Sequence, residues 1–178
     1  MSIELVFETH SMTTDNEQGF ATGWLPGRLS EVGRGFARAL GERRRDDGLA
    51  AVFTSDLARA VETAEIGFGG SGLAVREDRR LRECNYGELN GRPVSEINAE
   101  RLRRIDEPFP GGESYRDVVE RVRSFLGDLS PEFDASLVLL IGHSATRWAL
   151  EHLLIGTQLE DLVLAPFEWQ EGWTYRLD

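Results

Sequence analysis

One stretch near the start of the chain decides the fold, and it reads Leu5-Val6-Phe7-Glu8-Thr9-His10-Ser11-Met12-Thr13-Thr14-Asp15-Asn16. The run from Ile3 to Phe7 is apolar, which is typical of a short strand buried in a parallel sheet. Small polar residues follow it. His10 therefore lies just past the carboxyl end of a first strand, where open α/β sheets bind their ligands. A histidine at this place serves as a nucleophile, a base, a metal ligand or a structural residue, and the stretch alone does not choose between them.

The composition indicates one globular domain over residues 1–178. A chain of 178 residues is large enough to bury about 70% of its unfolded surface. The single cysteine, Cys84, excludes an internal disulfide and any multi-cysteine metal site. No apolar run reaches the roughly 18 residues that span a bilayer, and the N-terminus lacks the basic start of a signal peptide. We therefore expect a cytoplasmic protein without a membrane partner.

The net charge narrows the choice of partners. A formal charge of −11 argues against nucleic acid, because phosphate backbones bind to a basic face. A small anionic substrate remains compatible, since it needs only a local cluster of donors. All basic residues are arginine, which excludes a lysine Schiff base or lysine phosphate ligand. Nothing in the sequence reports on oligomeric state, and a homodimer is compatible with it.

Apolar runs and helical spacings alternate along the chain. We expect strands at residues 50–54, 73–75 and 137–141, the last of these being central because it is the most apolar, and one or two final strands within residues 167–177. This alternation favours an α/β fold with a mostly parallel sheet.

Four helices are expected between these strands. Residues 30–45 have Ser30 as a cap, and residues 57–66 have Ser55 or Asp56. The other two start near Tyr115 and at Ala145. The apolar face of the first helix is predicted to comprise Leu29, Val32, Phe36, Ala37 and Leu40.

The region from residue 79 to residue 110 is irregular in pattern and too long for an ordinary connector. We expect it to be an insertion that covers the site.

Two histidines occupy equivalent places. His10 and His143 each follow an apolar run, and adjacent parallel strands would bring them to one edge of the sheet. Arg59 lies one turn into a helix whose N-terminus offers free N–H groups and partial positive charge. Glu83 lies in the irregular region, within reach of that edge. Together these residues suggest a phosphate-binding site.

At this point the chain resembles the histidine phosphatase superfamily, also called phosphoglycerate mutase-like. The resemblance covers almost the whole length and rests on short motifs in family order. These are His10 with Asn16, Leu29-Ser30-Glu31-Val32-Gly33 with Ala37 and Ala39-Leu40-Gly41, Ser55-Asp56-Leu57-Ala58-Arg59-Ala60 with Thr63-Ala64, Leu81-Arg82-Glu83 with Gly87-Glu88 and Gly91, Pro110-Gly111-Gly112-Glu113-Ser114, and Gly142-His143-Ser144. It implies a three-layer α/β/α sandwich with a mostly parallel central sheet.

The resemblance also implies a mechanism. His10 would attack phosphorus and become a phosphohistidine, while Arg59 and His143 hold the phosphoryl oxygens. Glu83 would protonate the leaving oxygen and then activate water. Asn16 would donate a hydrogen bond to the phosphoryl group. No metal or other cofactor is implied, and the three histidines of the chain show no pair at metal-binding spacing.

One motif departs from the family. Its Arg-His-Gly reads Thr9-His10-Ser11 here, so the arginine beside the nucleophile is absent. Loss of such a donor costs roughly 10²–10³ in rate. Three explanations remain open. Another arginine substitutes (Arg147, Arg82 or Arg28), or the hydroxyls of Thr9, Ser11 and Thr13 serve a different substrate, or the pocket only binds.

Each site residue also has a simpler interpretation. In that interpretation Arg59 pairs with Glu62 or Glu65 on its own helix, Glu83 is a surface charge, and His143 is a core histidine. Their joint occurrence in family order favours function instead. The sequence thus predicts a metal-independent phosphomonoesterase acting on a small phosphorylated metabolite. The alternatives are a phosphoglycerate-type mutase and a catalytically impaired module that binds phosphorylated ligands and regulates a partner.

Overall fold

A computed structural model describes residues 2–129 and 131–178. The strands are β1 (Ile3–Thr9), β2 (Leu49–Thr54), β3 (Val75–Glu77), β4 (Leu137–Gly142) and β5 (Trp173–Leu177). The helices are α1 (Thr14–Gln18), α2 (Glu31–Arg44), α3 (Ala58–Phe68), α4 (Val94–Glu100), α5 (Tyr115–Asp128), α6 (Ser144–Leu154) and α7 (Leu159–Leu164). Single turns of 3₁₀ helix are η1 (Arg79–Leu81), η2 (Gly87–Leu89), η3 (Arg103–Ile105) and η4 (Pro131–Phe133).

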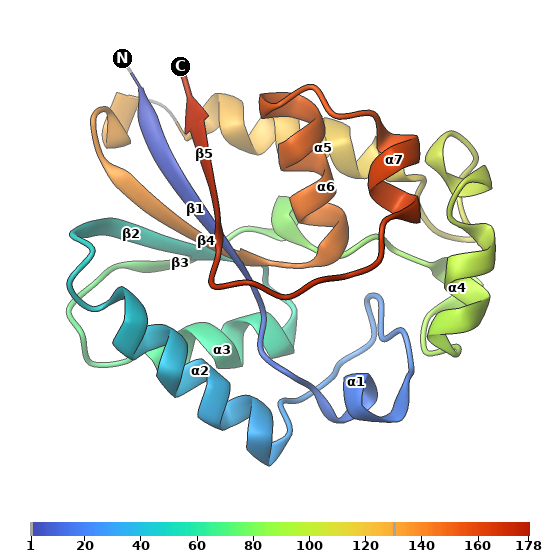
Figure 1. Cartoon of the computed structure of the whole chain (residues 1–178), viewed down its shortest axis with the longest axis horizontal. Helices are drawn as coiled ribbons and strands as arrows, with labels where there is room; N and C mark the ends of the chain where they lie inside the picture. The colour runs from blue at the N-terminus through green and yellow to red at the C-terminus, as the bar shows by residue number, and fades with distance from the viewer. Residues whose placement is uncertain (1, 130) are drawn as a thin grey trace.

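The five strands form one sheet in the order β3-β2-β4-β1-β5. All pairs are parallel except β1 with β5. Helices α5 and α6 lie on one face of the sheet, and α2 and α3 lie on the other (Figure 1). The expected three-layer α/β/α sandwich with a mostly parallel sheet is therefore confirmed, and the run at residues 137–141 is central as predicted.

The sheet separates two hydrophobic clusters of unequal size. Alternate residues of β1 point to opposite faces, so Ile3, Leu5 and Phe7 join the larger cluster beneath α5 and α6. Val6 joins the smaller one with Leu40 of α2. On that second face Glu8 is buried, and it forms ion pairs of 2.6 Å with Arg43 and 2.8 Å with Arg44 of α2. These pairs fix the C-terminal end of α2 to β1.

The predicted apolar face of the helix at residues 30–45 is wrong in part. Ser30 caps α2 as expected, but Val32 and Phe36 are 56% and 53% exposed. The buried face contains Gly33 and Gly41 instead, alongside Ala37 and Leu40. A Cβ at Gly41 would collide with the carbonyl of Gly67 on α3. Backbone contact between the helices thus rotates the large side chains of α2 outward.

The cap predicted for the helix at residues 57–66 is also wrong. The N-cap of α3 is Leu57, and no side chain caps it. The Ser55 hydroxyl is used elsewhere, as described below. The third strand lies at Val75–Glu77 rather than at residues 73–75, and the final region contains one strand, β5. The short helices α1 and α7 were not anticipated.

The region at residues 79–110 is mostly irregular, as expected, although it contains α4 and three single turns. In Figure 1 it emerges from the carboxyl end of the sheet and places α4 at the far edge of the molecule. In the part of the chain that the structure describes, no helix is long and apolar enough to cross a membrane.

Candidate active site

The register of β1 and β4 brings the two predicted histidines together. Thr9 pairs with Gly142, the last residue of β4. His10 and His143 follow these two residues directly, and their ring centroids are 5.0 Å apart. The backbone N–H of His10 also donates to the carbonyl of Gly142 at 2.9 Å. Two distant parts of the sequence thus form one pair of facing imidazoles because their strands are neighbours.

The His10 ring is held by backbone in the orientation of a nucleophile. Its Nδ1 lies 2.7 Å from the carbonyl oxygen of Ser11. A carbonyl only accepts, so Nδ1 carries the hydrogen, and the neutral ring has a lone pair on Nε2. Burial lowers the pKa of His10 to about 3, with the charge of Arg59 acting in the same direction and the Ser11 carbonyl opposing it. The ring is therefore neutral at physiological pH.

The His143 ring is held through its other nitrogen. Its Nε2 lies 2.7 Å from the Ser55 hydroxyl, and Ser55 Oγ also accepts the N–H of Leu57. A hydroxyl oxygen both donates and accepts, so this contact is compatible with the imidazole hydrogen on either ring nitrogen. Burial lowers the pKa of His143 well below its ordinary value, with the charge of Arg59 adding to the effect. Within the described residues the buried Nδ1 has no hydrogen-bond partner.

Arg59 brings a guanidinium to the same place. It lies in the first turn of α3 and is 3% exposed. One terminal nitrogen, Nη2, donates to the carbonyl of Gly23 at 2.8 Å. The other, Nη1, is buried and has no partner among the residues described. Glu62 pairs with Arg34 rather than with Arg59, so the simpler interpretation through that glutamate does not hold.

Thr63, on the same helix, connects Arg59 to the first loop. Its hydroxyl donates to the carbonyl of Arg59 at 2.7 Å and accepts the N–H of Ser11 at 3.0 Å. The loop that carries His10 and the helix that carries Arg59 are thus joined through one side chain. Ser11 itself is buried, and its backbone takes part in this link.

Glu83 is a buried carboxyl, not a surface charge. Its Oε1 accepts N–H groups from Cys84 at 2.7 Å and from Ala145, in the first turn of α6, at 3.3 Å. Burial raises the pKa of Glu83, while these N–H groups and the positive charges of Arg59 and Arg101 oppose the rise. A carboxyl of raised pKa beside a helix that starts at His143 suits proton donation and acceptance.

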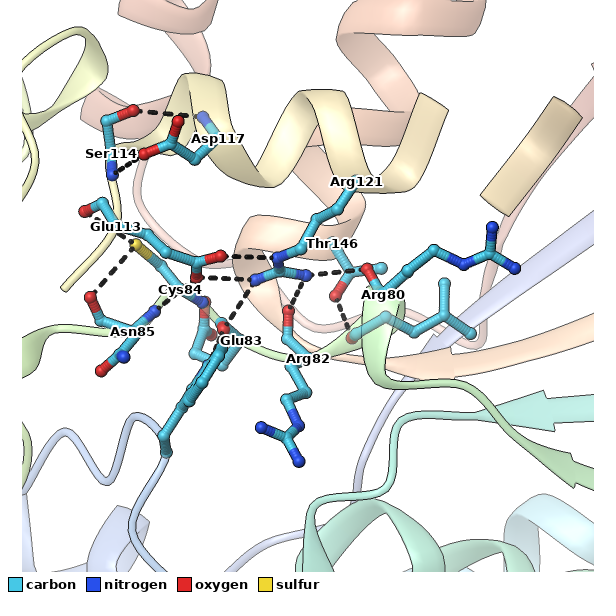
Figure 2. Close-up of polar contacts among 12 residues, drawn as sticks. Arg80, Arg82, Glu83, Cys84, Asn85, Glu113, Ser114, Asp117, Arg121 and Thr146 are labelled. Atoms are coloured by element: carbon cyan, nitrogen blue, oxygen red, sulfur yellow. Dashed lines mark hydrogen bonds and ion pairs between the residues drawn. The ribbon is translucent and has the colours of Figure 1, made fainter. Parts of the chain in front are cut away.

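The backbone of Glu83 is fixed by Arg121, a residue that no sequence motif singled out. Arg121 of α5 pairs with Glu113 at 2.9 Å and donates to the carbonyls of Arg80, Arg82 and Glu83 at 2.7–2.9 Å. Figure 2 shows its guanidinium at the centre of these contacts. Trp24 also donates its indole N–H to the Glu83 carbonyl at 2.7 Å. One side chain therefore positions the whole turn before Glu83.

Three further predicted residues lie at the edge of this group. Asn16 is exposed, and its Oδ1 accepts the N–H of Thr13 in a capping box at the start of α1. Thr9 ends β1 beside Gly142. Arg147 pairs with Glu151 at 2.5 Å and lies over the ring of Trp173, 4.9 Å from its centroid. Its guanidinium is thus directed along α6, away from the His143 end.

The other arginines considered as substitutes differ in their surroundings. Arg82 makes a two-pronged pair with Asp56, each contact 2.6 Å, and lies 4.5 Å from the centroid of the Trp24 ring. Arg28 is exposed. Arg82 and Arg147 are thus each paired with a carboxylate.

The group as a whole offers a nucleophilic nitrogen, two buried nitrogens without partners among the described residues and a carboxyl of raised pKa, all at the carboxyl edge of a parallel sheet. Such an arrangement is chemically matched to a phosphoryl group, which takes a nucleophile on one side and donors at its oxygens. The geometry is therefore chemically compatible with a phosphoryl group held against an imidazole.

Comparison with known proteins identifies the family. The model of the histidine phosphatase superfamily (branch 1) matches residues 5–169, which is most of the chain. The protein belongs to the histidine phosphatase superfamily, and the resemblance seen in the sequence is confirmed.

Individual relatives include both phosphatases and mutases. A 2,3-bisphosphoglycerate-dependent phosphoglycerate mutase 2 of Gloeobacter violaceus is 33% identical, and the match covers 96% of this chain and 88% of that protein. The solved structure of YhfR from Bacillus stearothermophilus has a TM-score of 0.83 at 29% identity and covers 95% of this chain and 88% of its own. A mycobacterial glucosyl-3-phosphoglycerate phosphatase complexed with VO3 has a TM-score of 0.80 at 30% identity, with 98% and 92% covered.

Proposed function

We propose that the protein is a metal-independent phosphomonoesterase that hydrolyses a small phosphorylated metabolite through a phosphohistidine on His10. One observation carries this proposal. Arg59 Nη1 and His143 Nδ1 are buried and have no partner among the described residues, and they accompany the bare Nε2 of His10. In this proposal the hydrogen of His143 is on Nδ1. Buried donors without partners cost free energy, and a phosphoryl group held against His10 would satisfy both.

The first step forms a bond from His10 Nε2 to phosphorus and breaks the bond from phosphorus to the alcohol oxygen. The proton of the Glu83 carboxyl goes to that oxygen, so that an alcohol leaves. Arg59 and His143 donate to the phosphoryl oxygens, where charge develops in the transition state. The Ser11 carbonyl keeps the hydrogen of His10 on Nδ1 throughout.

The second step reverses these roles with water. The Glu83 carboxylate takes a proton from water while the water oxygen attacks phosphorus, and the bond from phosphorus to His10 Nε2 breaks. Inorganic phosphate leaves, and Glu83 is protonated again for the next cycle. Transfer to a second alcohol in place of water would make the protein a mutase, the activity named for the relative from Gloeobacter violaceus. The phosphatase named among the solved structures supports hydrolysis.

The decisive experiment is a phosphatase screen of the purified protein, with p-nitrophenyl phosphate and a panel of phosphorylated metabolites. We expect release of inorganic phosphate and a loss on the order of 10⁴-fold or more in His10→Ala. His152→Ala is the matched control, because His152 lies on α6 with its Nδ1 at the Thr157 carbonyl, and it keeps wild-type activity. Intact mass measured at alkaline pH during turnover shows one added phosphoryl group in the wild type only.

The same screen tests the alternatives. Conversion of 3-phosphoglycerate to 2-phosphoglycerate that outpaces phosphate release would assign the mutase. The replacement of the motif arginine by Thr9, with Arg82 and Arg147 already paired to carboxylates, favours a second candidate, a module that binds phosphorylated ligands without turnover. Tight binding with no phosphate release, equal in the wild type and His10→Ala, would establish that module.

A further inference from the structure

A fully buried hydroxyl lies directly behind one of the two imidazoles of the candidate active site. Ser55 follows the last residue of β2 and is 0% exposed. Its Oγ lies 2.7 Å from His143 Nε2 and accepts the backbone N–H of Leu57 at 3.4 Å. Among the described residues, His143 Nε2 is the only hydrogen-bond acceptor that the Ser55 hydroxyl reaches. The contact between these two side chains therefore decides where the hydroxyl hydrogen can go.

The sheet sets the position of this hydroxyl. Strands β2, β4 and β1 are neighbours in that order, and Ser55, His143 and His10 each follow the end of one of them. Thr54 is paired with Ile141 in the register of β2 and β4, and the Ser55 N–H donates to the Ile141 carbonyl at 3.4 Å. The rings of His143 and His10 come next, with centroids 5.0 Å apart. The hydroxyl and the two imidazoles thus form one row along the carboxyl edge of the sheet.

A count of hydrogens favours one of the two tautomers of His143. The ring is neutral, because burial and the charge of Arg59 lower its pKa, so only one ring nitrogen carries a hydrogen. With that hydrogen on Nε2, the Ser55 hydrogen and the Nδ1 lone pair would both lack a partner among the described residues. With the hydrogen on Nδ1, Ser55 donates to Nε2, and only the N–H at Nδ1 lacks one. Each buried group without a partner costs free energy, so the second arrangement is preferred.

We propose that Ser55 is a positioning residue, whose hydroxyl donates to His143 Nε2 and so keeps the hydrogen of His143 on Nδ1 as a donor to the phosphoryl group. This inference rests on the proposed phosphatase function. Phosphoryl oxygens are negatively charged acceptors, so an N–H at Nδ1 attracts them whereas a lone pair there would repel them. Ser55 acts through His143, just as the Ser11 carbonyl acts through His10 by holding its hydrogen on Nδ1.

The tautomer can be observed directly by nitrogen NMR of protein labelled at histidine. Correlation spectra of the ring atoms show which nitrogen carries the hydrogen, and the chain has only three histidines. Spectra of His10→Ala and His152→Ala assign the signals. We expect the hydrogen of His143 on Nδ1 in the wild type, and a second population with the hydrogen on Nε2 in Ser55→Ala. A hydrogen on Nε2 in the wild type, or an unchanged single tautomer in Ser55→Ala, overturns the inference.

Steady-state kinetics measures what the tautomer contributes to turnover. We expect kcat for p-nitrophenyl phosphate to fall by about 10- to 100-fold in Ser55→Ala, less than the roughly 10²–10³ for loss of a donor outright. KM should change by less than about threefold, since the donor acts mainly in the transition state. Thr54→Val is the matched control, because Thr54 is equally buried and its hydroxyl has no partner among the described residues. Equal kcat in the two variants, both folded by circular dichroism, contradicts the role of Ser55.

A double-mutant cycle separates positioning from a purely structural role. If Ser55 acts only through the imidazole, Ser55→Ala causes no further loss of kcat in protein that already carries His143→Ala. A loss that is as large in that background as in the wild type would show that Ser55 acts independently of His143, and the inference would fail.

Binding of inorganic phosphate separates this inference from the proposed function. Calorimetric titration needs no turnover, and we expect phosphate to bind about 3- to 10-fold more weakly to Ser55→Ala than to Thr54→Val. That difference, together with the change of tautomer, supports the role of Ser55 even if no phosphate ester is hydrolysed. Equal binding to the two variants removes it, while phosphatase activity that is lost in His10→Ala would still stand.

Discussion

The two halves of the candidate active site are held in place by different means. His10 and His143 follow neighbouring strands, and backbone hydrogen bonds of the sheet set their separation. Glu83 lies on a segment of single turns, and Arg121 of α5 holds that segment by its carbonyls. The first half is specified by secondary structure, whereas the second depends on one side chain from a distant helix.

This difference predicts different sensitivities. Changes at the strand ends affect the attack on phosphorus, which every substrate shares. Changes around Glu83 affect the proton that the leaving group needs, so their effect varies with the leaving group. Three variants and one pH profile test this difference.

The largest effect is expected in Glu83→Gln. An amide cannot give a proton to the leaving oxygen, so we expect kcat for an alkyl phosphate to fall by about 10²–10⁴. The loss for p-nitrophenyl phosphate should be much smaller, since p-nitrophenolate leaves without protonation. Steady-state kinetics on both substrates gives the comparison. Equal losses would show that Glu83 acts on the attack itself and would remove the distinction between the halves.

The next effect concerns the altered motif beside His10. Thr9→Arg adds a cation at the place where the family has one, and we expect kcat for p-nitrophenyl phosphate to rise by about 10- to 100-fold through charge stabilisation. Thr9→Met is the control for side-chain length without charge. A decrease in Thr9→Arg would instead favour the explanation in which the hydroxyls of Thr9, Ser11 and Thr13 serve a different substrate.

Arg121→Met should disturb the position of Glu83 without changing that of His10 and His143. It removes the pair with Glu113 and three hydrogen bonds to carbonyls. We expect the free energy of unfolding in urea to fall by about 2–4 kcal/mol, and kcat/KM for alkyl phosphates to fall by about 10- to 30-fold as Glu83 loses its position. Arg123→Met on the same helix is the control, because Arg123 is exposed. Equal behaviour of the two variants would contradict the role of Arg121.

The smallest effect is a limb in the pH profile. Glu83 must be protonated for the first step, so kcat/KM for an alkyl phosphate falls as pH rises through the raised pKa of Glu83. His10 must be neutral, and its pKa of about 3 imposes no loss above that pH. We expect a decline of about 3- to 10-fold across that limb. We expect the pH profile of Glu83→Gln on the same substrate to lack this limb. An identical decline in Glu83→Gln would show that another group causes the limb.

The sequence predicted the first half of the site well for a physical reason. A short apolar run followed by polar residues specifies a buried strand and its end, and parallel neighbours must share an edge. The positions of His10 and His143 follow from this pattern. Arg59 was selected from its place near a helix N-terminus and Glu83 from its place in the irregular region, and the family motifs then supported both.

The partners of these residues were not predictable in the same way. Ser55 was expected to cap a helix, yet its hydroxyl lies at His143 from another strand end. Arg121 looks like an ordinary charge on an amphipathic helix, and only the tertiary structure shows that it contacts Glu113 and three carbonyls next to Glu83. The burial of Val32 and Phe36 was wrongly predicted for a similar reason. Apolar spacing along a helix does not reveal that its buried face needs glycine where it contacts the backbone of a neighbouring helix.

That glycine contact limits how the protein tolerates mutation. Gly41 and Gly67 let α2 and α3 touch backbone to backbone, and α3 carries both Arg59 and the threonine that is tied to the loop of His10. A methyl group at Gly41 would displace α3 and move the guanidinium relative to the imidazoles. Gly41 is therefore among the positions where a library of random substitutions should yield the fewest acceptable replacements.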